Sequence, residues 1–161
     1  MPQSNARTRA DEDQKGIVLG RMVELNTSLV CLDISRMKLT DDDAAHLIRA
    51  LDVNTTLKSV STATVGLGRD SCRDSCPTLT VGRCCEQLSL AANQLHWPAG
   101  TAFGKFLARN TSLEELDLSG NELHNEGVYS FRDALIDNHT LIYLNLASCG
   151  VADEVKKITI F

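Results

Sequence analysis

The sequence has few aromatic residues, a shortage of basic charge and no long apolar run. Aromatic residues make up 4% of the 161 residues, and 16 Lys and Arg face 21 Asp and Glu, giving a net charge of −5. Because phosphate groups are bound by basic surfaces, this balance argues against nucleic acid as the main partner. No stretch approaches the roughly 18 apolar residues of a membrane-spanning helix, and the polar N-terminus lacks the apolar segment of a secretory signal. We therefore expect a cytoplasmic protein without a nucleic-acid or membrane partner.

Leucine dominates the apolar residues that are present, with 22 of the 161 residues. Such a bias is typical of proteins built from internal repeats. Five residues, which we call markers, lie 28 positions apart: Asn26, Asn54, Gly82, Asn110 and Asn138. Apolar residues recur three, six and eight positions after most of these markers. The register is kept from residue 26 to residue 151 without an insertion, so the chain consists of repeats.

Each repeat combines a strand, a turn and a helix. The slots six and eight positions after a marker alternate as in a short strand that faces a core. Eleven positions after the marker, Asn93, Asn121 and Cys149 occupy a turn, where their side chains can bond neighbouring backbone groups in a stacked ladder. Helical spacing follows, with Thr40 as a candidate N-cap and Pro98 at a helix start, and residues 16–25 show the same helical pattern. The marker asparagines end these helices, and Asn tolerates the left-handed turn at such a helix end.

The pattern L-x-x-L-x-L-x-x-N/C-x-L resembles the leucine-rich repeat, and the 28-residue period resembles the ribonuclease-inhibitor-like subclass, most closely over residues 110–138. That subclass includes ribonuclease inhibitor, the C-terminal regions of NLR receptors, Ran GTPase-activating proteins and tropomodulin-like proteins. The resemblance implies an α/β solenoid of about five repeats, a right-handed horseshoe with parallel strands on its concave face and helices on its convex face. It covers residues 15–155, which leaves residues 1–14 as a disordered leader and residues 156–161 as a tail.

The second repeat departs from this pattern. Thr62 occupies a core slot, Val65 replaces the turn asparagine, and Pro77 falls where a helix interior is expected. We expect an irregular loop or a frayed convex segment over residues 66–82. Both ends lack the polar caps that repeat arrays need. We therefore expect either a fragment of a larger receptor or regulatory protein, or an array that its apolar tail covers.

The six cysteines and the marker asparagines each allow a second interpretation. Cys72, Cys76, Cys84 and Cys85, with His96 beyond, could ligate a metal, but no pair has the two-residue gap of structural zinc sites. A disulfide from Cys72 or Cys76 is the alternative to reduced thiols, which the cytosol favours. The markers begin N-x-S/T triplets, as in glycosylation acceptors, yet their regular spacing favours a structural role. We expect neither a metal nor a cofactor.

Little in the sequence supports catalysis. The four histidines share no motif with a Ser or Cys nucleophile, and no Gly-rich phosphate loop is found. The resemblance to Ran GTPase-activating proteins implies that Arg36, with Asn93 or Asn121, could assist GTP hydrolysis, although both asparagines hold ordinary turn positions. A GTPase-activating protein is therefore the alternative to a non-enzymatic binding protein.

Side chains that alternate with the core slots along each strand form the candidate binding surface. They are small and polar, become acidic at Glu115 and Asp117, and include Tyr143 as an amphipathic anchor. Such a surface attracts a partner with a basic surface. We expect a non-enzymatic protein–protein interaction scaffold whose partner-binding residues are Asp33, Gln87, Ser89, Glu115, Asp117, Tyr143 and Asn145. The alternative is that these are ordinary solvated strand positions.

Overall fold

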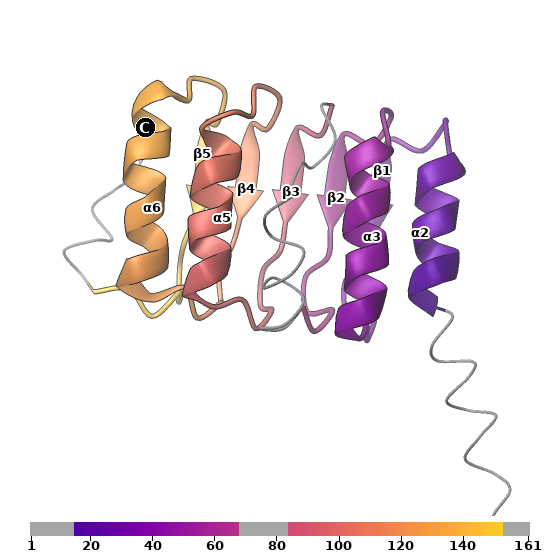
Figure 1. Ribbon diagram of the computed structural model, residues 1–161, viewed down its shortest axis with the longest axis horizontal. Coiled ribbons are helices and arrows are strands. Elements are labelled where there is room, and N and C mark those ends of the chain that lie inside the picture. Colours follow the sequence, from indigo (N-terminus) through magenta and orange to yellow (C-terminus); the bar gives the residue numbers. More distant parts are fainter. Residues whose placement is uncertain (1–14, 68–83, 153–161) are drawn as a thin grey trace, which may run out of the picture.

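The computed structural model describes residues 15–67 and 84–152. In this part of the chain, helices and strands alternate, and Figure 1 shows the helices as one layer in front of the strands. The described helices are α2 (Lys15–Leu25), α3 (Asp41–Val53), α5 (Trp97–Leu107) and α6 (His124–Asp137). None of the helices in these two ranges is both long and apolar enough to cross a membrane.

The described strands form one parallel sheet in sequence order, and they are β1 (Cys31–Asp33), β2 (Ser59–Ser61), β3 (Gln87–Ser89), β4 (Glu115–Asp117) and β5 (Tyr143–Asn145). Each strand residue pairs with the one 28 positions later, as Leu88 does with Leu116. The period of the sequence is therefore the register of the sheet. Parallel neighbours require a crossover connection, which a helix commonly supplies, so the predicted α/β arrangement is confirmed.

The core lies between the sheet and the helix layer, and the leucine slots fill it. At the strand centres, Val60, Leu88 and Leu116 are between 0% and 4% exposed. On the helix side, Phe103 and Phe131 are equally buried. Removing such side chains from water supplies about 2 to 3 kcal/mol each, so the slots that recur in the sequence carry the stability of the array.

Local signals set where the helices begin. The Thr40 hydroxyl accepts from the N–H of Asp43 at 3.2 Å, and the N–H of Thr40 donates to the Asp43 carboxylate at 2.9 Å, which makes a capping box at α3. Burial acts to raise the pKa of Asp43, but hydrogen bonds from Thr40 and from the N–H of Gly16 outweigh it, so the pKa is lowered. Pro98 lies in the first turn of α5, where its missing N–H costs nothing. Both predicted helix starts are confirmed.

The chain turns after each strand through a residue in the left-handed region. These residues have φ between 50° and 69° and are Arg36, Thr64, Ala92, Gly120 and Ser148. Two marker asparagines, Asn54 and Asn138, do not use the left-handed conformation that Asn tolerates, since their φ values are −70° and −84°. Their side-chain oxygens instead accept from the N–H groups two and three residues later. An Asn side chain can thus organise a helix end without a left-handed backbone.

The marker asparagines also link neighbouring repeats. The Nδ2 atom of Asn54 donates to the carbonyl oxygens of Val23 and Asn26 at 2.7 and 3.0 Å. Asn138 makes the equivalent pair of bonds to the repeat before it, at 2.7 and 3.1 Å. Glycosylation would need this nitrogen, which the backbone of the preceding repeat already binds, so the structure supports the structural role of these two residues.

The turn slots form the predicted ladder. The Oδ1 atom of Asn93 accepts from the three N–H groups of residues 65–67 at 3.1 to 3.2 Å, and its Nδ2 atom donates to two carbonyl oxygens at 2.9 Å. Asn121 bonds the preceding repeat in the same way. In the last turn, the Sγ atom of Cys149 lies 3.1 Å from the carbonyl oxygen of Leu118. Buried backbone groups between repeats are satisfied by these side chains.

The described start of the second repeat follows the common pattern despite its unusual residues. Thr62 is buried, and its hydroxyl donates to the carbonyl oxygen of Ser89 at 3.3 Å. Val65 is buried in the turn slot, and its N–H donates to Asn93. Residues 68–83, which contain most of the predicted irregular segment, lie outside the described residues. The predicted leader, residues 1–14, and tail, residues 156–161, do so too.

Two glycines allow α5 and α6 to meet closely. A Cβ atom added at Gly100 would lie 2.6 Å from the Cα atom of Gly127, and one added at Gly104 would overlap the carbonyl oxygen of Ser130. The Ser130 hydroxyl also donates to the Thr101 hydroxyl at 3.2 Å. The two helix backbones are therefore in direct contact at these positions.

Candidate functional site

The candidate site lies on the strand face, by which we mean the first and third residues of β1 to β5. The middle residue of each strand is directed toward the core, so by alternation these residues are directed away from it. Parallel pairing places six of the seven predicted binding residues in two rows across β3, β4 and β5, with strands about 4.8 Å apart. One row is Gln87, Glu115 and Tyr143, and the other is Ser89, Asp117 and Asn145.

The seventh predicted residue, Asp33, is not part of this group. It lies on β1, and Ser61 of β2 separates it from Ser89. The Asp33 carboxylate accepts from the N–H of Ser35 at 2.9 Å. Hydrogen bonds from the side chain and the backbone of Ser35, with Arg36 nearby, lower the pKa of Asp33. Asp33 therefore closes the turn after its own strand.

Hydrogen bonds orient the polar side chains of the two rows. The Nε2 atom of Gln87 donates to Oε1 of Glu115 at 3.2 Å. The side-chain oxygens of Asp117 and Asn145 accept from the N–H groups two residues later, at 2.9 and 3.1 Å. These hydrogen bonds favour one orientation of Glu115, Asp117 and Asn145, and such orientation before binding reduces the entropy lost on binding.

Tyr143 provides apolar area beside these polar groups. It is 52% exposed, and the adjacent Ile142 is 64% exposed. Tyrosine is enriched among residues that dominate interface energies, because its ring buries much area while its hydroxyl stays hydrated. The end of the strand face at β5 thus combines an aromatic anchor with the carboxylates of β4.

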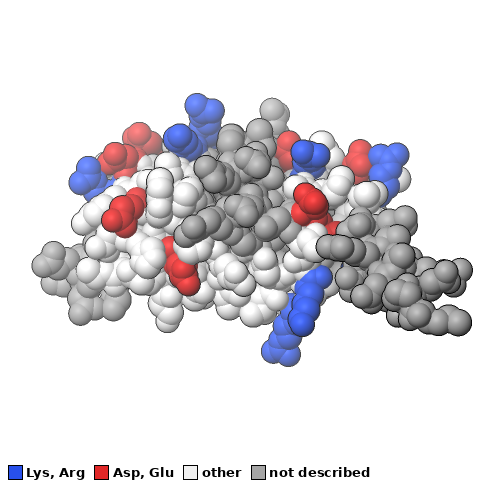
Figure 2. Space-filling model, turned by 60° about the horizontal axis from the view of Figure 1, so that its bottom comes forward, with Lys and Arg blue, Asp and Glu red and all other residues white. Residues whose placement is uncertain are grey.

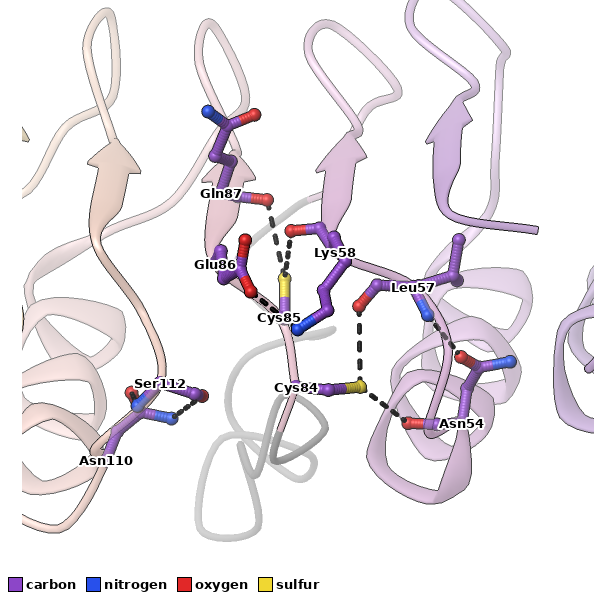
Figure 3. Close-up of polar contacts among 9 residues, drawn as sticks. All are labelled: Asn54, Leu57, Lys58, Cys84, Cys85, Glu86, Gln87, Asn110 and Ser112. Atoms are coloured by element: carbon purple, nitrogen blue, oxygen red, sulfur yellow. Dashed lines mark hydrogen bonds and ion pairs between the residues drawn. The ribbon is translucent and has the colours of Figure 1, made fainter. Parts of the chain in front are cut away.

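An ion pair that was not among the residues predicted from the sequence lies beside the strand face. The Nζ atom of Lys58 lies 2.5 Å from Oε1 of Glu86 (Figure 3), and this hydrogen bond raises the pKa of Lys58. Both residues come four positions after their markers, so the repeat register places them at equivalent positions of neighbouring repeats, but it does not show that their side chains meet. Because Glu86 is paired, the acidic character of this surface is strongest at Glu114, Glu115 and Asp117. Figure 2 shows acidic and basic side chains next to one another along the top of its view, and a few isolated charged side chains on the largely uncharged surface below.

The described cysteines are free thiols. Figure 3 shows the sulfur of Cys84 directed at the carbonyl oxygens of Asn54 and Leu57, at 3.8 and 3.6 Å, and that of Cys85 at the carbonyl oxygen of Gln87, at 3.4 Å. No cluster of three or more metal-ligating side chains occurs within residues 15–67 and 84–152. The predicted alternatives that involve residues 72 and 76 lie outside those ranges.

Burial raises the pKa of Cys85 from 9.0 to about 11, and this shift makes the stability of the protein depend on pH. The unfolded thiol ionises near pH 9 while the folded thiol remains neutral. The stabilisation is therefore complete below pH 9 and is lost as the pH rises toward 11. We expect a loss on the order of 2 kcal/mol across this window, measured by urea unfolding at each pH.

A Cys85→Ala variant provides the control for this titration. Alanine has no proton to lose, so the decline between pH 9 and pH 11 should be shallower than in the wild type by the contribution of Cys85. Parallel declines in both proteins would show that other groups cause the pH dependence.

Two of the three residues that the GTPase-activating alternative requires, Asn93 and Asn121, already bind backbone groups of the fold. Asn93 and Asn121 are 6% and 2% exposed, and both bind backbone groups of adjacent repeats. Arg36 is exposed and holds the left-handed turn position after β1, with φ of 66°. The two asparagines are therefore structural and are not free to orient a nucleotide or a water.

Comparison with known proteins supports the repeat assignment. Residues 109–131 and 137–154 match a family described as Leucine Rich repeat. No curated protein matches the sequence as a whole or in part. The matched segments include β4, β5 and most of α6, so they contain two of the three strands that carry the two rows of the strand face, while β3 lies outside them.

Solved structures share the fold over most of the chain. The tropomodulin C-terminal domain of Caenorhabditis elegans superimposes with a TM-score of 0.70 at 15% identity, covering 88% of this chain and 87% of that domain. Leiomodin-1 actin-binding site 2 gives a TM-score of 0.69 at 16% identity, with coverage of 80% and 77%. The chain therefore contains segments that match the leucine-rich repeat family, and over most of its length it has an α/β fold like that of the tropomodulin domain. None of these matches supports the GTPase-activating alternative.

Proposed function

We propose that this protein is a non-enzymatic scaffold that binds a partner protein through the strand face of β3, β4 and β5. The observation that carries the proposal is the alignment of six polar or aromatic side chains in two rows across neighbouring strands. An exposed tyrosine at one end and preoriented carboxylates at the centre are the ingredients of a specific protein interface.

The charge of the site favours a partner with a basic surface. Three acidic residues lie on or beside β4, namely Glu114, Glu115 and Asp117. The acidic residue just before β3, Glu86, is paired with Lys58 and adds little net negative charge. Complementary charge of this kind accelerates association and selects among partners more than it adds affinity. Binding should therefore weaken as salt concentration rises.

We also propose a repeat subclass, a cellular location and a first partner to test. We place the array, residues 15–155, in the ribonuclease-inhibitor-like subclass, as a right-handed horseshoe of about five repeats with the strand face concave. A cytoplasmic location is consistent with the free thiols of the described residues. Because one structural neighbour is named for an actin-binding site, actin is the first partner to test.

The test measures binding of monomeric actin, and selection of ligands from a random peptide display library, by wild type and variants. We expect a double reversal, Glu115→Lys with Asp117→Lys, to weaken binding by about tenfold or more, equivalent to about 1.4 kcal/mol. Tyr143→Ala should act in the same direction. Asp133→Lys with Asp137→Lys, which reverses two exposed carboxylates on α6, is the matched control and should bind like the wild type.

The outcomes separate the site from the partner. If selected peptides are rich in Lys and Arg and lose binding only with the strand-face variants, the proposal holds whether or not actin binds. Equal binding by the strand-face variant and the helix control would contradict it.

A further inference from the structure

One carboxylate joins the starts of the neighbouring helices α2 and α3. One oxygen of the Asp43 carboxylate accepts from the N–H of Gly16 at 2.6 Å, and the other accepts from the N–H and the hydroxyl of Thr40, at 2.9 Å each. Gly16 lies in the first turn of α2, and Thr40 is the N-cap of α3. Figure 1 shows the two helices side by side at one end of the helix layer. The carboxylate therefore holds the start of both helices at the same time.

Close packing of the helices does not by itself require this carboxylate. A Cβ atom added at Gly16 would overlap the Cα atom of Asp43, and one added at Gly100 of α5 would overlap the Cα atom of Gly127 of α6. Gly127 is the repeat equivalent of Asp43, so α5 and α6 meet equally closely without a charge. Asp43, which is 3% exposed, is the one charged side chain that is buried among the described residues. Carboxylates are rarely buried unless they are paired, so this group has a task beyond filling space.

The other end of α2 is held by a group that does not titrate. The Nδ2 atom of Asn54, at the end of α3, donates to the carbonyl oxygens of Val23 and Asn26. The Val23 side chain is buried in the core beside this attachment. The start of α2 is thus attached through an ionisable side chain, and its end is attached through an amide and a core residue.

Protonation changes what the Asp43 side chain can accept. A protonated carboxyl group carries an O–H donor on one oxygen, so it can no longer accept from all three donors. Burial acts to raise the pKa of Asp43, but the bonds from Thr40 and Gly16, together with the charge of Lys15, lower it below 3.8. The attachment is therefore complete above pH 3.8 and is lost as the pH falls through the pKa of the folded protein. The other charged or titratable residues of the two helices are Arg21, Glu24, Asp41, Asp42, His46, Arg49 and Asp52.

We propose that Asp43 is an acid-sensitive latch that holds the first turns of α2 against α3. While the carboxylate is ionised, α2 is docked along its whole length. When the carboxylate is protonated or removed, the start of α2 separates from α3, whereas the end that Asn54 holds stays in place. The opening exposes Leu19, which packs against the core from the first half of α2. Opening is therefore directional and begins at the Gly16 end of the helix.

Amide hydrogen exchange of the full chain at neutral pH tests the latch. Asp43→Ala removes both accepting oxygens and should accelerate exchange over residues 16–20 at least about tenfold. Exchange over residues 113–118, in β4 and the core below it, should stay slow and so verify that the array is folded. Asp42→Asn changes the exposed preceding carboxylate and is the matched control, which should exchange like the wild type. Asn54→Ala should give the opposite direction, with the larger acceleration over residues 22–26.

Acidification of the wild type tests the latch without a variant, and it decides the matter if Asp43→Ala fails to fold. Between about pH 5 and pH 2.5, residues 16–20 should lose protection before residues 22–26 and 113–118, after correction for the intrinsic exchange rates. Simultaneous loss of protection in all three segments would overturn the proposal. Exchange over residues 16–20 that is equal in the wild type and in folded Asp43→Ala would do the same. Neither measurement involves a partner, so the proposed function of the strand face is tested separately.

Discussion

Replacing Asn93 by alanine is expected to lower the free energy of unfolding by about 3 to 4 kcal/mol. The Asn93 side chain accepts three backbone N–H bonds from residues 65–67 and donates to the carbonyl oxygens of Thr62 and Leu90. Alanine leaves these groups buried without partners, and a buried unsatisfied group costs about 1 to 3 kcal/mol. Urea unfolding followed by circular dichroism measures the loss.

Two further variants identify the cause of this loss. Gln94→Ala changes an exposed neighbour and should alter stability by no more than about 0.5 kcal/mol. Asn93→Cys should lose less than Asn93→Ala, since Cys149 fills the equivalent slot and bonds the Leu118 carbonyl oxygen. If Asn93→Ala costs less than about 1 kcal/mol, the ladder is not an important part of the stability.

Gly104→Ala is expected to destabilise the protein by about 2 to 3 kcal/mol, although alanine favours helices by about 1 kcal/mol over glycine. The added Cβ atom would overlap the carbonyl oxygen of Ser130 on α6. A backbone atom cannot move aside as a flexible side chain can, so α5 and α6 must separate. Thermal and urea unfolding both report the change.

Helix propensity alone would make Gly104→Ala stabilising, so a loss of stability identifies the close contact between α5 and α6 as the cause. Lys105→Ala is the control, because Lys105 is the next residue of α5 and is exposed. This change should alter the free energy of unfolding by no more than about 0.5 kcal/mol. A Gly104→Ala protein that is as stable as the wild type would show that the two helices are not in backbone contact.

Most of the fold could be predicted because one sequence period determines several structural features at once. The 28-residue spacing sets the strand pairs, as for Leu88 and Leu116, and the core slots follow from it. Helix starts at Thr40 and Pro98 were predictable because capping depends on residues close in sequence. The position of Asn54 at the end of α3 was predictable, but its conformation was not, since an asparagine can end a helix through its backbone or through its side chain.

For the candidate site, the sequence could predict which residues lie on neighbouring strands but not where their side chains lie. The register identifies which residues share a row, such as Gln87 and Glu115, and counting strands would have separated Asp33 from them. It does not show where long side chains end. The Lys58–Glu86 pair depends on such conformations, and therefore it became evident only in three dimensions.

The side-chain bonds between repeats also determine how the molecule comes apart. Asn54 holds the end of α2, and Asn93 holds the turn of the second repeat, so each repeat is tied mainly to its neighbours. In a chain of nearest-neighbour couplings, opening begins at an end and advances one repeat at a time. Amide hydrogen exchange should then be fastest in the terminal repeats and slowest around Leu95 and Leu116, giving the array a gradient of local stability along its length.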